Sequence, residues 1–106
     1  MEKTLESLTR EERSLLLYFE CVSVDYSGLI DGLKINNEDN DIAKRWASEG
    51  FIEFGRVKLE DVEKNGRKSL WVTLSDNAWE LAHRERRDRA KRNWSSRRWR
   101  KNSEDR

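Results

Sequence analysis

The chain has 106 residues, of which 41% are charged, and its formal net charge at neutral pH is +1. At this length we expect one small domain with an appendage. The single cysteine excludes an internal disulfide, and the longest apolar run, residues 15–19, is far shorter than the roughly 20 residues of a membrane-spanning helix. Because residues 1–9 lack the pattern of a secretory signal, we expect a cytoplasmic location.

The first predicted helix spans residues 10–25. Thr9 and Glu12 have the spacing of a capping box, in which each side chain binds a free amide group at the start of a helix. Apolar residues then repeat at helical spacing along one face: Leu15, Phe19 and Val22. We expect the lone cysteine, Cys21, to be a small buried residue of this helix.

Two more helices are predicted before the first strand. The apolar cluster in residues 29–35 favours a short second helix, although its intrinsic helix propensity is weak. The polar and acidic residues 36–41 offer several N-caps for a third helix, which we expect to end near Glu49. Gly50 is placed to terminate that helix in the left-handed conformation.

Strands are predicted after the third helix. Residues 51–54 favour a short strand, and Asn65-Gly66 is typical of a two-residue hairpin turn, because that turn needs positive φ at both positions. A turn at these two residues fixes the register of the hairpin. It places two apolar pairs on one face: Val57 with Leu74, and Leu59 with Val72.

A final helix is predicted to begin near Asn77. Ser75 or Asp76 can cap it. We expect its first apolar residues to contact the core: Ala78, Trp79, Leu81 and Ala82. The tryptophans of the body should also lie in the core or at its edge: Trp46, Trp71 and Trp79.

This order of elements resembles the winged helix-turn-helix family. The residues that carry the resemblance are Ala43, Trp46, Gly50, Phe51 and Ile52. In that family the recognition helix typically ends with an apolar residue, three spacers, a glycine and two apolar residues, and Trp46 to Ile52 reproduce this pattern. The resemblance covers about residues 9–82 and implies a small α+β fold whose third helix and hairpin wing contact DNA.

The third helix, however, is more acidic than a DNA-reading helix should be. Its outward positions include Glu38, Asp39, Asp41, Ser48 and Glu49. Only Lys44 and Arg45 would attract a duplex there, so this helix either contacts DNA through them or presents a solvated or protein-binding face. At the wing tip, Lys64, Arg67 and Lys68 either contact phosphates or keep an exposed hairpin end from aggregating.

The clearest functional signal is the uneven distribution of charge. Residues 1–82 contain 11 Lys and Arg against 17 Asp and Glu, a net charge of −6, whereas residues 83–106 contain 11 against 4, a net charge of +7. We therefore divide the chain into a folded domain, 1–82, and an arginine-rich tail, 83–106, which is helical to about Trp94 and frays without an anion. Such a tail favours a polyanionic partner, of which nucleic acid is the commonest.

The tail contains most of the candidate contacts. The expected phosphate-binding residues are Arg84, Arg86, Arg87, Arg89, Lys91, Arg92, Arg97, Arg98, Arg100 and Lys101. Trp94 and Trp99 either stack on bases or pack on the domain or a second copy. The spacing of residues 84–87 and Trp94 resembles the arginine-rich RNA-hairpin-binding peptides of lambdoid phage antiterminators, which implies backbone contacts by the arginines and base stacking by the tryptophan.

These observations favour a nucleic-acid-binding protein of transcription-regulatory or phage-like type, with DNA and RNA both open as ligands. The only histidine, His83, has no triad or metal-ligand motif beside it, so we expect it to lie on the surface of a helix. The sequence also lacks a phosphate-binding glycine loop, so we expect no enzyme, cofactor, metal or small-molecule substrate. The alternative is an interaction module, in which the acidic third helix and the basic tail bind a protein partner or form a homodimer.

Overall fold

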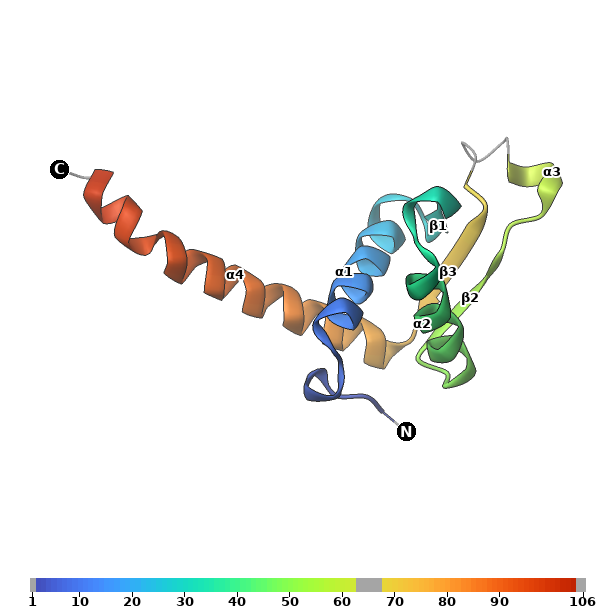
Figure 1. The fold of residues 1–106 in the computed structure, drawn as a ribbon, viewed down its shortest axis with the longest axis horizontal. Coiled ribbons are helices and arrows are strands. Elements are labelled where there is room, and N and C mark those ends of the chain that lie inside the picture. Colours follow the sequence, from blue (N-terminus) through green and yellow to red (C-terminus); the bar gives the residue numbers. More distant parts are fainter. Residues whose placement is uncertain (1, 63–67, 105–106) are drawn as a thin grey trace.

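A computed structural model describes the backbone of residues 2–62 and 68–104, and the side chains of these residues up to Trp94. The chain forms a small α+β domain from which one long helix projects (Figure 1). The elements are α1 (Arg10–Asp25), β1 (Leu29–Ile30), α2 (Asn37–Ser48), β2 (Ile52–Arg56), α3 (Leu59–Val62), β3 (Leu70–Leu74) and α4 (Asp76–Glu104), with 3-10 turns at Leu5–Ser7 and Gly32–Lys34.

Helix α1 begins where it is predicted to begin. The Thr9 hydroxyl accepts the amide of Glu12 at 3.1 Å and the Glu12 carboxylate accepts the amide of Thr9 at 2.8 Å, which confirms the capping box. The predicted apolar face is also buried: Leu15, Phe19 and Val22. The prediction for Cys21 is wrong, because this residue lies about 200° around the helix from Phe19 and is exposed, with its Sγ 3.4 Å from Asp25.

The predicted helix over residues 29–35 is wrong. Leu29–Ile30 form a strand that pairs antiparallel with Leu70 and Trp71, and only Gly32–Lys34 form a 3-10 turn. Ile30 is completely buried in the core, and the weak helix propensity of the segment does not compete with that burial. The strand approaches β3 closely at Gly28, which has φ of +84° and where an added Cβ would lie 2.4 Å from the carbonyl oxygen of Val72.

Helix α2 confirms the prediction for a helix that ends near Glu49. Asn36 and Asp39 form a second capping box, and Gly50 takes φ of +76° after the last turn. Ala43 and Trp46 are completely buried, so the predicted face of the helix is the one that packs on the core.

The sheet has the order β1-β3-β2, and its hairpin register differs from the predicted one. Leu74 pairs with Ile52 instead of Val57, and Val72 pairs with Phe54 instead of Leu59, a difference of five residues. The strand predicted for 51–54 forms one side of the hairpin, because Ile52 and Phe54 pack against the core. Leu59 instead begins the short helix α3 and is exposed. The predicted turn, Asn65-Gly66, lies outside the described residues.

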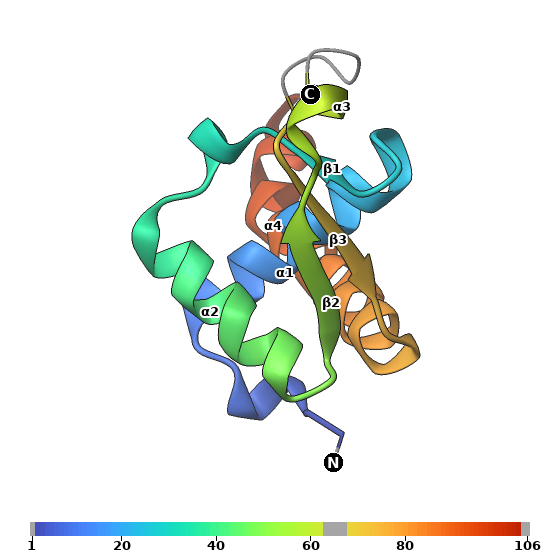
Figure 2. The same ribbon diagram turned by 90° about the vertical axis from the view of Figure 1, so that its right-hand side faces the viewer.

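Helix α4 begins at Asp76, where the hydroxyl of Ser75 accepts the amide of Ala78 at 3.1 Å. It runs without a break to Glu104, beyond the predicted end near Trp94. Ala78, Leu81 and Ala82 are buried as predicted, Trp46 lies at the centre of the core, and Trp71 and Trp79 are half-buried. Figure 2 shows α1 and the start of α4 behind the sheet and α2 beside β2.

Candidate nucleic-acid interface

The predicted basic tail is continuous with the fold, because it forms the middle and the end of α4. The first turns of α4 pack on α1 and on the sheet, and the later turns extend away from the body (Figure 1). Apolar contact ends at Ala82, since the next buried residue of α4 is the charged Glu85. From this point the helix is held to α1 by ion pairs.

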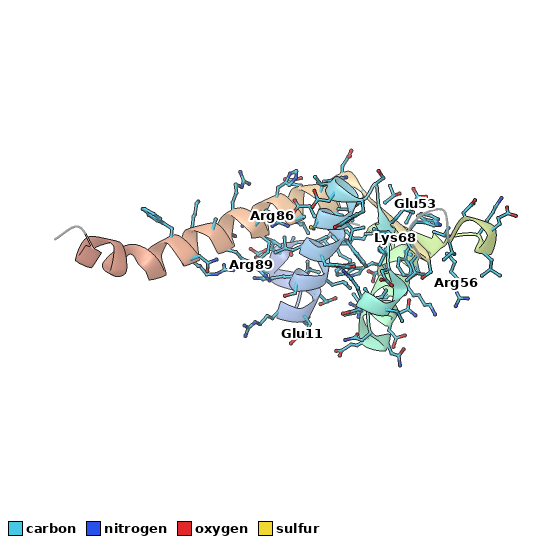
Figure 3. The ribbon with its side chains drawn as sticks, turned by 90° about the horizontal axis from the view of Figure 1, so that it is seen from above. Glu11, Glu53, Arg56, Lys68, Arg86 and Arg89 are labelled. Atoms are coloured by element: carbon cyan, nitrogen blue, oxygen red, sulfur yellow. The ribbon has the colours of Figure 1, made fainter. Side chains whose placement is uncertain are left out.

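Glu20 of α1 is the first anchor. Its carboxylate is 5% exposed and accepts a hydrogen bond from Nε of Arg86 at 2.5 Å, and Nε2 of His83 lies 3.2 Å from it. Arg86 also donates to the carbonyl of Leu17 at 3.4 Å. A buried carboxylate is costly without such partners, so Arg86 and His83 have a structural role in docking α4. Figure 3 shows Arg86 and Arg89 on the part of α4 that lies beside α1.

Glu85 of α4 is the second anchor. Its carboxylate is 2% exposed and accepts Nε of Arg89 at 2.6 Å and a guanidinium nitrogen of Arg92 at 3.3 Å, and Arg13 of α1 lies 3.8 Å away. Burial raises the pKa of Glu85, but the hydrogen bonds and charges of Arg89 and Arg92 outweigh this effect, so its pKa is lowered overall. Arg89 also donates to the hydroxyl of Ser14 at 3.2 Å, which ties this cluster to α1.

Glu85 was not predicted to have a role, because in the sequence it is a single acid within a basic run. Its spacing to Arg89 and Arg92 is i, i+4 and i, i+7, which places all three on one side of a helix. That signal was present in the sequence. The remote partner Arg13 carries no comparable signal.

The side of α4 that faces away from α1 carries cations that do not bond to Glu20 or Glu85. Arg84, Arg87 and Lys91 follow one another at helical spacing and are exposed. Arg84 lies 3.6 Å from the carboxylate of Glu6, and both side chains are largely exposed, so that pair is weak. Trp94 follows on the next turn with 55% of its surface exposed.

The remaining tail residues lie on the last turns of α4, where the structure describes the backbone alone. These are Arg97, Arg98, Trp99, Arg100 and Lys101. Their helical backbone continues the direction of the preceding turns away from the body (Figure 1).

The candidates in the body are separated from α4. Arg45 forms an ion pair with Glu12 at the start of α1, whereas Lys44 is exposed on α2 among the exposed acids Glu38, Asp41 and Glu49. Just before β3, the ammonium group of Lys68 lies 4.8 Å from the centre of the Tyr26 ring. Lys64 and Arg67 lie outside the described residues.

The described part of the chain brings together no group of three His, Cys, Asp or Glu side chains that would hold a metal ion. Within the same residues, every helix is too short or too polar to cross a lipid bilayer. Comparison of the chain with protein-family models, with curated proteins and with solved structures finds no match.

Proposed function

We propose that this chain is a nucleic-acid-binding protein of winged-helix type that grips phosphates through α4. In this interpretation α2 corresponds to the recognition helix, β2 and β3 with their connection form the wing, and the 3-10 turn Gly32–Lys34 stands where a second helix would be. The order of elements supports the assignment. The chemistry of α4 supports the function.

One observation carries the proposal: α4 separates its structural cations from its outward ones. Arg86 and Arg89 bond to buried carboxylates, whereas Arg87 and Lys91 form no ion pair among the described residues and are exposed. A helix that presents a row of such cations matches the regular negative charge of a nucleic-acid backbone. Trp94, exposed one turn further, adds a ring on which a base can stack.

Helix α2 is poorly suited to the role that the winged-helix family gives it. Arg45 is neutralised by its ion pair with Glu12. Lys44 is exposed among Glu38, Asp41 and Glu49 and forms no ion pair with the residues that the structure describes. Carboxylates brought near phosphates repel them, so α2 lowers the affinity for a duplex. Affinity therefore comes chiefly from α4, and the body positions that helix.

The test is a binding panel measured by fluorescence anisotropy with duplex DNA, single-stranded DNA and an RNA hairpin. We compare the wild-type chain with Arg87→Gln/Lys91→Gln, and the matched control is Lys34→Gln/Lys44→Gln, which removes the same charge from exposed positions of the body. Loss of two phosphate contacts should weaken binding about tenfold near physiological salt, and the control should change it less than about twofold.

Two results would contradict the proposal. An equal loss in both double variants would show that net charge or α2, rather than α4, sets the affinity. A wild-type chain that binds none of the three nucleic acids would remove the function altogether. If that chain then forms a dimer that dissociates at high salt, the acidic face of α2 and the basic face of α4 would be protein-binding surfaces instead.

A further inference from the structure

A cleft of about 520 Å³ lies between the start of α1 and the middle of α4. Arginines from both helices line it, together with one carboxylate and an amide: Arg10, Arg13, Arg89, Arg92, Glu85 and Asn93, with Leu8 at its edge. The charge split in the sequence does not reveal this cleft, because two of its arginines come from the acidic body.

The cleft is strongly cationic despite its buried carboxylate. Four guanidinium groups and the single charge of Glu85 leave a net charge of +3 among the lining residues. Four guanidinium groups carry about 20 N–H donors, whereas one carboxylate offers about four acceptor positions. The positive charge of the cleft therefore exceeds the negative charge of Glu85. Its N–H donors also outnumber the acceptor positions of that carboxylate.

The protein holds several of these guanidinium groups in place by contacts of its own. Arg13 donates from Nε and a terminal nitrogen to the carbonyl of Leu5 at 3.1 and 2.6 Å, and Arg89 donates to both Glu85 and Ser14. Glu85 is buried beneath them and accepts Arg92 as well. Groups fixed in this way lose little further side-chain entropy when a ligand binds.

We propose that this cleft binds a phosphate group of the nucleic acid that α4 engages. The inference rests on the proposed function for the source of the phosphate, while the chemistry of the cleft requires only a small tetrahedral oxyanion. Guanidinium groups bind phosphate through paired, charge-assisted hydrogen bonds.

The position of the cleft on α4 fits a bound strand. Arg89 and Arg92 lie on the side of α4 that faces α1, and Arg87 and Lys91 lie on its outward side. A helix placed in a nucleic-acid groove meets phosphate backbones along two of its sides. The cleft therefore binds one backbone, and the outward row of cations binds the other.

The experiment observes the arginine Nε–Hε signals of the full chain by NMR during titration with inorganic phosphate. The signals of Arg10, Arg13, Arg89 and Arg92 should shift together with one affinity, while that of Arg56, which does not line the cleft, serves as an internal reference. Arg10→Gln should weaken phosphate binding about tenfold, since it removes one charge-assisted contact. Arg10 is exposed and at the first position of α1, and Arg56→Gln is the control of equal charge.

A second titration adds an oligonucleotide to the phosphate-loaded chain. Displacement of phosphate from the four arginines supports the proposal. Cleft signals that still report bound phosphate after the oligonucleotide has bound would overturn the assignment to nucleic acid and make a free phosphate ester the ligand. An equal, unsaturated shift at Arg56, or no shift at the cleft, would overturn the site itself. If phosphate binds and no oligonucleotide does, the proposed function fails while the cleft stands.

Discussion

The inner part of α4, its side that faces α1, and the outer part, its opposite side, have similar basic composition but different surroundings. On the inner part, Arg86 and Arg89 bond to carboxylates that the fold buries, whereas on the outer part Arg87 and Lys91 are exposed. Neighbours in the sequence such as Arg86 and Arg87 therefore have different roles, one structural and one exposed. A count of arginines therefore does not show which of them also hold the fold together.

Truncation shows most strongly which turns of α4 hold the fold. Ending the chain after Ala82 removes the turns of α4 that carry both anchors, so Glu20 loses Arg86 and His83. We expect a loss of about 3 to 5 kcal/mol in the free energy of unfolding, measured by urea denaturation. Ending the chain after Trp94 keeps both anchors and should change stability by less than about 0.5 kcal/mol. Equal stability of the two truncated chains would contradict the division of α4.

Single substitutions of the adjacent residues Arg86 and Arg87 test the same division. Arg86→Ala removes the strongest partner of Glu20 and should cost about 2 kcal/mol, because Arg86 itself is half exposed and part of its effect is screened. Arg87→Ala should cost less than about 0.5 kcal/mol. Urea denaturation measures both. If Arg87→Ala is the more destabilising variant, the structural and outward roles are exchanged.

Acid should weaken the inner part through Glu85. Its pKa is lowered in the folded chain, so its contribution to stability is present above the ordinary pKa of a glutamate and is lost as pH falls through the lowered value. The wild-type chain should therefore lose more stability between neutral pH and about pH 3 than Glu85→Gln does. Thermal unfolding as a function of pH gives the measurement. Parallel pH profiles of the two chains would show that Glu85 is not held by Arg89 and Arg92.

The outer part should show its role in salt dependence, the smallest of these effects. Lys91→Gln should reduce the slope of the logarithm of affinity against the logarithm of salt concentration by about 1, as expected for one lost phosphate contact. Lys44→Gln on α2 should leave that slope unchanged. Anisotropy titrations at several salt concentrations compare them, and a larger change for Lys44→Gln would move the interface to α2.

Local signals predicted α1 and α2 well. The capping boxes that begin α1 and α2, and Gly50 after α2, involve residues within four positions of one another, so the sequence contains the whole of each motif. The register of the hairpin was not predictable in this way. It depends on Ile52 and Phe54 reaching the core, and the strand-like pattern of residues 57–59 was an equally good local match.

For the candidate site, too, some features follow from local sequence and others from the fold. Composition and spacing alone predict that basic residues gather after Ala82, that a helix can run through them, and that acids dominate α2. Which arginines are anchored and which are outward depends on how the chain folds, and so does the meeting of Arg10 and Arg13 with Arg89 and Arg92 around one cleft. These partners are far apart along the chain. Glu20 and Arg86 are 66 residues apart, and a pairing of that kind forms only when packing of α1 on α4 buries the carboxylate.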